Sequence, residues 1–203
     1  MTIQASGAIK FSDIENEFGV ANPVSLSQYY SVDAGVPSSG QIKFSDFYGK
    51  VINATRTIGD ATNFNARNDF TNASIVGGLK SASTVYSNGQ AVKYYVTVNG
   101  IVSASDTSTT SFDTGNFPGG SSLYLTNNNY IVGAGGRGGD NSGGGGSPGG
   151  PALTLRLSTY ITNNGTIGGG GGGGGAGGDR STKNCRKTGC CSQQCYTATG
   201  SGG

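Results

Sequence analysis

The sequence predicts a mainly β protein with a small N-terminal module of short strands and helices, a central β-sandwich-like meander and a C-terminal glycine-rich region. Three observations support this fold class. A nine-residue motif recurs near the N-terminus, Asn-Gly dipeptides separate β-prone runs in the middle, and glycine supplies 39 of the 203 residues. We expect four segments, at residues 1–50, 51–118, 119–178 and 179–203, of which the last is a cysteine-rich basic tail.

The N-terminal segment contains the motif SGAIKFSDI at residues 6–14, which returns as SGQIKFSDF at residues 39–47. Each copy predicts a short strand that turns into a short helix, because Ser12 and Ser45 are good N-cap residues. Ser25 is a further N-cap candidate, and apolar residues follow it on one helical face. The apolar residues of this segment make a small core, so we expect the module to dock on something else.

The central segment, residues 51–118, contains Asn-Gly dipeptides at 88–89 and 99–100. This dipeptide favours a tight hairpin turn, in which both central residues need a positive φ. Between the two dipeptides, apolar and more polar side chains alternate over residues 92–98, which indicates a strand with one buried face. The segment therefore predicts a β-meander that forms part of a small sandwich.

Two related units occupy the glycine-rich segment, YLTNNNYIVGAGG at 124–136 and YITNNGTIGGGGG at 160–172, at an offset of 36 residues. Each unit has a β-like run, an asparagine turn, an apolar residue and a glycine tract. Glycine supplies 22 of the 46 residues from 133 to 178. A collagen helix is excluded, because glycine does not recur strictly at every third position and proline is rare.

Two interpretations of the glycine tracts stay open. Glycine-rich chains can serve as flexible linkers. The alternative is a bundle of polyglycine-II-like rods, extended at three residues per turn, whose backbone groups pair laterally. The regular offset and the flanking apolar segments favour the rods. The eight consecutive glycines at 168–175 should then have lateral partners, whereas a mobile, unpaired run would favour a linker.

The tail contains all four cysteines in the pattern C-x4-C-C-x3-C. Disulfides, a metal site, and free thiols or bridges between chains are all compatible with it. Two disulfides would stabilise a loop that has no core of its own. Zinc ligands usually come in pairs two to four residues apart, and no histidine is present, so we expect no bound metal. The disulfide candidates are Cys185, Cys190, Cys191 and Cys195.

Composition excludes several classes of function. The chain has no histidine, which removes the commonest general base, and no carboxylate pair stands out, so we expect no enzyme activity and no cofactor. A net charge of +2 does not indicate nucleic-acid binding. No apolar run reaches the length of a membrane span, and the N-terminus lacks the features of a signal peptide. We therefore expect synthesis in a cytoplasm and no membrane insertion.

The two ends of the chain resemble bacteriophage virion proteins. The segments IKFSDIENEFG, NPVSLSQYY and GQIKFSDFYGK are similar to the opening module of tail-fibre and tail-tip proteins of tailed phages. The glycine-rich half resembles the fibre-tip adhesins of T-even-type phages, in which polyglycine-II tracts form a sandwich whose connecting loops touch a receptor. The resemblance implies a virion protein, made in the host cytoplasm, that joins other tail or baseplate proteins through its N-terminus. It further implies a homotrimer that binds a bacterial surface receptor, either a protein or lipopolysaccharide.

Candidate residues follow from this hypothesis. The residues expected to anchor the chain to the virion are Ile9, Phe11, Ile42, Phe44 and Phe47. The residues expected to contact the receptor are Arg137, Asp140, Asn141, Arg180, Lys183, Arg186, Lys187 and Tyr196. The basic side chains suit anionic groups such as lipopolysaccharide phosphates, although they also suit a solvated tail. A structural baseplate or decoration protein without receptor contact is the alternative function, and a tailspike depolymerase is a third.

Overall fold

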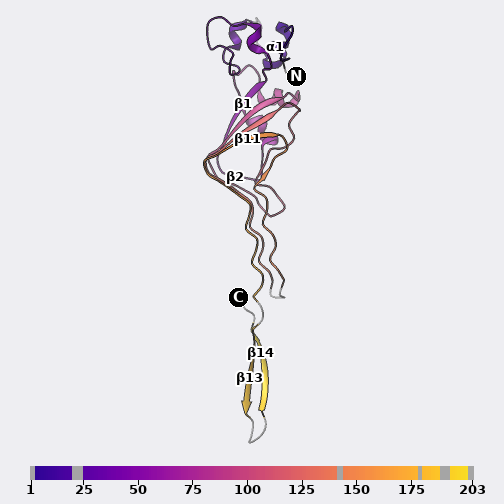
Figure 1. The fold of residues 1–203 in the computed structure, drawn as a ribbon, viewed down its shortest axis with the longest axis vertical. Helices are drawn as coiled ribbons and strands as arrows, with labels where there is room; N and C mark the ends of the chain where they lie inside the picture. The colour runs from indigo at the N-terminus through magenta and orange to yellow at the C-terminus, as the bar shows by residue number, and fades with distance from the viewer. Residues whose placement is uncertain (1–2, 20–24, 141–143, 178–179, 188–192, 201–203) are drawn as a thin grey trace.

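The computed structural model describes residues 3–19, 25–140, 144–177, 180–187 and 193–200. Figure 1 shows an elongated molecule with the helical N-terminal module at one end, a β-sheet body, a narrow stem of extended segments and a hairpin at the other end. The prediction of a mainly β protein is confirmed. No helix in the described ranges is long and apolar enough to cross a membrane.

The body is a parallel β-solenoid, in which successive coils of the chain stack on one another. Each of the first three coils contributes one strand to each of three sheets, and the fourth contributes two strands. In chain order, the strands of the four coils are β1 (Ile52–Ile58), β2 (Ala61–Thr62) and β3 (Phe64–Asn65); β5 (Val92–Val98), β6 (Val102–Ser103) and β7 (Phe112–Asp113); β8 (Ser122–Asn127), β9 (Tyr130–Val132) and β10 (Leu153–Thr154); and β11 (Ser158–Asn163) and β12 (Thr166–Gly168).

The strand pairing overturns the predicted meander. The sheet with the order β11-β8-β5-β1-β4 contains parallel pairs throughout, except that the short β4 (Ser74–Ile75) runs antiparallel to β1. The other two sheets, β12-β9-β6-β2 and β10-β7-β3, are entirely parallel. Parallel neighbours need a long crossover rather than a hairpin, and here each crossover is a full coil. One sheet therefore holds strands from both sides of the boundary expected after residue 118.

Neither Asn-Gly dipeptide forms a hairpin. Asn88 is the C-cap of α3 (Ala82–Ser87), and Gly89 has the left-handed φ of +58° that commonly follows a helix. Gly100 lies at a corner of the second coil, and its φ is not in the left-handed region. A Cβ atom at Gly100 would lie closer than 3.0 Å to the backbone of Gly59 and Asp60, so glycine is needed there because two coils approach closely.

The offset of 36 residues corresponds to one coil of the solenoid. Tyr160 pairs with Tyr124 in adjacent strands, and Ile167 pairs with Ile131. The asparagines at the shared corner form a ladder, in which the Asn164 amide donates to Asn128 Oδ1 at 2.9 Å. The predicted order of strand, asparagine turn and apolar strand is confirmed in both units.

The interior of the solenoid is apolar and continuous with that of the N-terminal module. Along β5 the burial alternates strictly, with Val92, Tyr94, Val96 and Val98 buried, as the sequence pattern predicts. On the neighbouring face the rings of Phe64 and Phe112 lie 5.2 Å apart in paired strands, so the core is built from side chains stacked across coils.

The N-terminal module contains α1 (Phe11–Phe18) and the short 3-10 helices η1 (Leu26–Tyr29) and η2 (Phe44–Phe47). The predicted N-caps Ser12 and Ser45 are wrong, because both residues lie inside their helices. The N-cap of each motif copy is the preceding lysine, whose backbone N–H donates at 2.8 Å to a carboxylate three residues later. Ser25 is confirmed as the N-cap position of η1.

The module packs on the first coil of the solenoid, which supplies the partner that its small core requires. Lys80, in the first crossover, donates to the backbone oxygen of Glu17 at 2.8 Å and to Gln90 Oε1 at 3.0 Å. The backbone N–H of Ile52 donates to Glu17 Oε1 at 3.3 Å. Burial raises the pKa of the Glu17 carboxyl.

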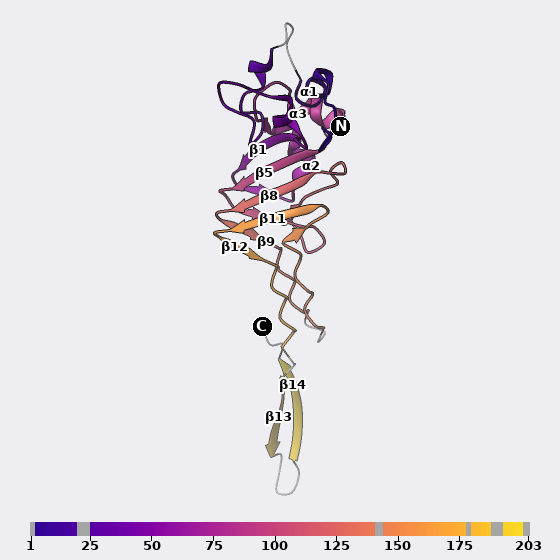
Figure 2. The ribbon, with the colours of Figure 1, turned by 45° about the horizontal axis from the view of Figure 1, so that its top comes forward.

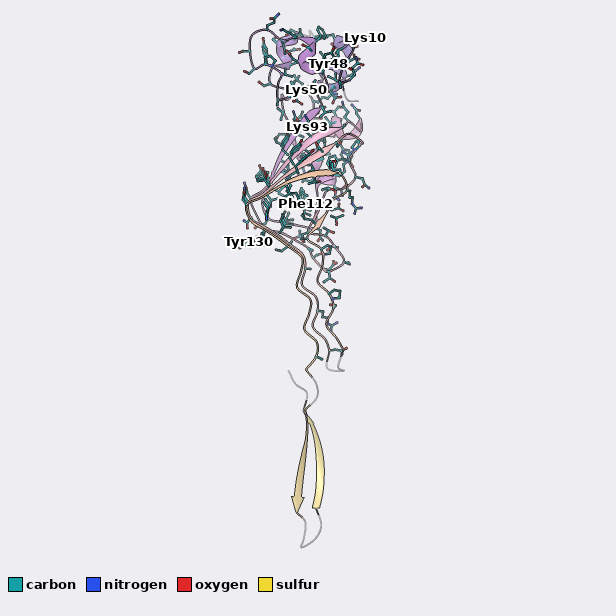
Figure 3. The ribbon with its side chains drawn as sticks, viewed as in Figure 1. Lys10, Tyr48, Lys50, Lys93, Phe112 and Tyr130 are labelled. Carbon is teal, nitrogen blue, oxygen red and sulfur yellow. The ribbon has the colours of Figure 1, made fainter. Side chains whose placement is uncertain are left out.

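Ion pairs add to this junction. Asp33 is buried and pairs with Lys50 at 3.3 Å and with Lys93 of β5 at 3.6 Å. Figure 3 shows both lysines where the module meets the solenoid. The module therefore covers the free end of the first coil, as a capping unit does in repeat proteins.

The remaining elements are short or lie in the tail. The helices α2 (Ala66–Asp69) and η3 (Phe70–Asn72), with α3, belong to the crossover after the first coil. The tail forms a hairpin of β13 (Arg180–Lys187) and β14 (Gln193–Gly200).

Candidate functional site

Three extended glycine-rich segments leave the solenoid and form the stem. We call them the first rod (133–139), the second rod (144–150) and the third rod (168–176). Figures 1 and 2 both show them side by side between the sheets and the hairpin. Figure 3 shows few side chains along this stem, in contrast to the body.

The rods are joined by backbone hydrogen bonds that recur at every third residue. Gly133, Gly136 and Gly139 of the first rod donate to the third rod at 2.7 to 2.9 Å. In the third rod, Gly170 and Gly173 donate to the second rod at 2.9 Å. The second rod donates in turn to the first rod, through Ser147 and Gly150 at 2.8 Å, so each rod is bonded to both of the others. The first and second rods run antiparallel, because residue numbers rise along one as they fall along the other.

The space available for a side chain also varies along the rods with a period of three residues. A Cβ atom would lie closer than 3.0 Å to the backbone of another rod at Gly133, Gly136, Gly139, Gly146, Gly149, Gly170 and Gly173. At Gly150, where the second rod ends, it would lie 2.8 Å from the Cα atom of Thr107 in the solenoid. Gly145, Gly168, Gly171, Gly174 and Gly175 have open space around the same position. None of these glycines has a φ in the left-handed region, so close approach of the backbones, and not turn geometry, is what excludes side chains.

The outward positions of the rods carry the polar side chains. Arg137, Asp140 and Ser147 line a shallow hollow of about 190 Å³ near the far end of the first two rods, together with four glycines. The backbone N–H of Arg137 donates to Ser147 Oγ at 2.7 Å, which joins the two rods beside the hollow. Two predicted receptor residues, Arg137 and Asp140, therefore share one surface, whereas Asn141 lies outside the described residues.

The other predicted receptor residues lie on the hairpin, beyond the rods. Arg180, Lys183, Arg186 and Lys187 all belong to β13, and Tyr196 lies on β14 opposite Asn184. The strand register also places Cys185 directly opposite Cys195. Cys190 and Cys191 lie outside the described residues, so the predicted disulfides stay a prediction.

Three of the five predicted anchoring residues, Phe11, Phe44 and Phe47, belong to an aromatic cluster in the N-terminal module. The ring of Phe11 lies 6.0 Å from that of Tyr29 and 6.2 Å from that of Phe44. Phe47 is fully buried, so it supports the module from inside, whereas Phe44 is 41% exposed. Ile9, Phe11 and Ile42 are half-buried. Four of the five side chains are therefore accessible to a partner.

Sequence reasoning missed a ladder of tyrosines on the outer face of the largest sheet. The rings of Tyr95, Tyr124 and Tyr160 stack in successive coils, with centroids 4.7 and 4.8 Å apart and nearly parallel planes. Tyr160 ends the ladder and is 60% exposed. The offset of 36 residues aligns Tyr124 with Tyr160 and could have revealed this pair, but the parallel register of β5 was needed to add Tyr95.

The chain matches a known protein family. The profile described as "Phage tail fibre adhesin Gp38" matches residues 53–203, which include the solenoid, the rods and the hairpin. The chain belongs to the phage tail fibre adhesin Gp38 family. No curated protein and no solved structure matched the chain.

Membership of the Gp38 family confirms the predicted class of protein. The chain is a bacteriophage tail fibre adhesin with a role in host attachment, and its location is the virion. Binding to a host surface receptor and to other phage tail components follows from the same assignment. The Gp38 match begins at Asn53, directly after the N-terminal module, so the resemblance stated for that module stays a prediction.

Proposed function

We propose that this adhesin attaches to the virion through residues 1–50 and recognises the host surface through its glycine-rich C-terminal half, without catalysis. The observation that carries the proposal is the period of three in the rods. Every third position faces another rod, and the positions between them can carry other side chains without disturbing the packing. Arg137 and Asp140 occupy such positions, at the end of the rods away from the N-terminal module.

The rods themselves are best described as a small polyglycine-II bundle. A spacing of three residues between lateral hydrogen bonds agrees with three residues per turn. Each rod costs on the order of 1–2 kcal/mol of backbone entropy per ordered residue, so the lateral bonds and the solenoid that anchors the rods must offset this cost. A rigid bundle would hold its recognition surface in place at little further entropic cost on binding.

The N-terminal role rests on a different part of the surface. Phe44 and its half-buried neighbours offer an apolar contact for another tail or baseplate protein. We further propose that the assembled protein is a homotrimer, because small domains of this kind gain stability by burying surface between subunits. The mass of the purified protein in solution tests the trimer directly.

Deletion of residues 133–203 tests the division of labour. The shortened protein loses β10 to β12 with the rods and the hairpin but keeps the N-terminal module and the strands β1 to β9, so we expect it to be incorporated into virions. Adsorption to host cells should fall by at least about tenfold, because the deletion removes every residue proposed to contact the receptor. The measurement pairs virion composition with the adsorption rate.

A hairpin deletion, residues 180–203, serves as the companion variant, because it retains the rods and separates their contribution from that of the basic tail. Virions that carry the 133–203 deletion and adsorb normally would contradict the proposal. Virions that fail to assemble with it would favour the structural baseplate or decoration role.

A further inference from the structure

A second polar pocket lies on the flank of the solenoid, away from the rods. It has a volume of about 430 Å³ and is lined by Asn65, Arg67, Asn68, Tyr86, Asp113, Gly115, Asn116 and Arg156. This volume is within the range of about 300–1,000 Å³ that is typical of small-molecule sites. The lining is mostly polar and charged, so the pocket does not suit an apolar ligand.

The topology explains how these distant residues meet. Phe64, Phe112 and Leu153 stack in the three strands β3, β7 and β10. The residues that follow each strand therefore emerge at one corner of three successive coils. Tyr86 joins them from α3, which belongs to the crossover between the first two coils.

Internal contacts fix one side of the pocket. Arg156 Nε donates to Asp113 Oδ1 at 2.9 Å, and Arg156 Nη2 donates to Asp113 Oδ2 at 3.0 Å. The Arg156 guanidinium holds the pKa of the Asp113 carboxyl below its usual range, so this carboxylate remains ionised as a hydrogen-bond acceptor. The backbone N–H of Gly115 also donates to Asp113 Oδ1, at 2.8 Å.

Arg67 supplies a positive charge on the other side. Its guanidinium lies over the Tyr86 ring, 3.7 Å from the centroid, and Nη2 donates to the Tyr86 carbonyl at 3.4 Å. No ion pair of the described residues involves Arg67. A guanidinium has five N–H donors in a planar arrangement that suits a carboxylate or phosphate, so most of this donor capacity is available to a ligand.

The other lining groups suit hydroxyls. Asn68 and Asn116 are exposed at the rim, and each amide group offers both a donor and an acceptor. Gly115 has a left-handed φ of +69°, and a Cβ atom there would lie closer than 3.0 Å to Arg67 and Asn65. Glycine at this position therefore keeps the space beside Arg67 open.

We infer that this flank pocket binds an acidic sugar, with Arg67 on its carboxylate or phosphate and Asn68, Asn116 and Asp113 on its hydroxyls. The inference rests on the proposed function only for the source of the ligand, which is a glycan of the host surface. It adds a second recognition site, in the body of the adhesin, to the surface proposed at the rods.

Titration of the purified full chain tests the inference. The probes are glucuronate, glucose 6-phosphate, glucose and inorganic phosphate, followed by NMR or calorimetry. We expect at least one acidic sugar to bind at least about tenfold more tightly than glucose and inorganic phosphate, a difference of about 1.4 kcal/mol. Comparison of the carboxylate and phosphate sugars identifies the acidic group that the pocket prefers.

Variants locate the binding. Arg67→Gln should weaken acidic-sugar binding at least about tenfold, and Asn116→Asp should weaken it by charge repulsion at an exposed position where folding is not at risk. Lys43→Gln, which removes an exposed charge from the N-terminal module, should leave binding unchanged. Equal binding of glucose, equal binding of inorganic phosphate, or unchanged binding in both pocket variants would overturn the inference.

The sugar titration uses the full chain, because the 133–203 deletion also removes Arg156 from the pocket. If the unsubstituted full chain binds no acidic sugar while adsorption still depends on the rods, only the pocket is contradicted. Sugar binding that persists while the 133–203 deletion adsorbs normally contradicts only the proposed role of the rods.

Discussion

Replacing Gly173 by alanine is expected to separate the third rod from the first. A Cβ atom at this position would lie closer than 3.0 Å to the carbonyl group of Arg137, and the obstacle is backbone that no side-chain rotation can relieve. Overpacking typically costs about 1–3 kcal/mol of stability, and one hydrogen bond makes a net contribution of about 1 kcal/mol. The few hydrogen bonds between two rods therefore do not outweigh the steric cost of the added methyl group. Limited proteolysis of the stem should become much faster, while the solenoid keeps its unfolding temperature.

The adjacent residue provides a matched control. Gly174 has no atom within 4 Å of the same Cβ position and no left-handed φ. Gly174→Ala should leave the stem intact, or stabilise it by about 0.4–1 kcal/mol through the reduced entropy of the unfolded chain. Equal protease sensitivity in the two variants would mean that the backbones of the rods do not approach as described.

The second large effect is expected in the core of the solenoid. Phe112 is fully buried, and it stacks on Phe64 in the coil before and pairs with Leu153 in the coil after. Phe112→Ala should lower the free energy of unfolding by about 3–5 kcal/mol, because it leaves a cavity between two coils. Urea denaturation of the full chain, followed by circular dichroism, measures the change.

Tyr130→Ala is the control for this substitution. Tyr130 lies in another short strand, β9 of the third coil, and is 50% exposed. Figure 3 shows it at the periphery of the body. Its loss should cost less than about 1 kcal/mol, in the range usual for surface positions. A cost for Phe112→Ala no larger than that for Tyr130→Ala would contradict the stacked core.

The sequence predicted those features that depend on local pattern and on repetition. Alternation over residues 92–98 predicted the buried face of β5, and the offset of 36 residues aligned β8 with β11. The glycine tracts favoured rods over a linker, because a linker needs neither a regular offset nor flanking apolar segments, and their polyglycine-II geometry stays a prediction. Family resemblance predicted the class of protein that the family comparison confirms.

Other features depend on contacts that no local pattern encodes. The Asn-Gly dipeptides suggested hairpins, but Gly100 is required by the neighbouring coil, and only knowledge of the parallel register could show this. The N-caps predicted at Ser12 and Ser45 are wrong because each helix begins before the serine that was expected to cap it. In each motif copy the backbone N–H of the N-cap lysine donates to the aspartate carboxylate three residues later. Arg67, Tyr86 and Arg156 are far apart in sequence, so the flank pocket was not visible before the coils were stacked.

We propose that the rods form an ordered bundle, paired at every third residue. Amide hydrogen exchange, measured by NMR on the full chain, tests it most directly. We expect slow exchange at Gly136, Gly139, Gly170 and Gly173, whose N–H groups donate to a neighbouring rod. Exchange at Gly171 of the third rod should be fast. Uniformly fast exchange through residues 168–175 would contradict the bundle and restore the flexible linker.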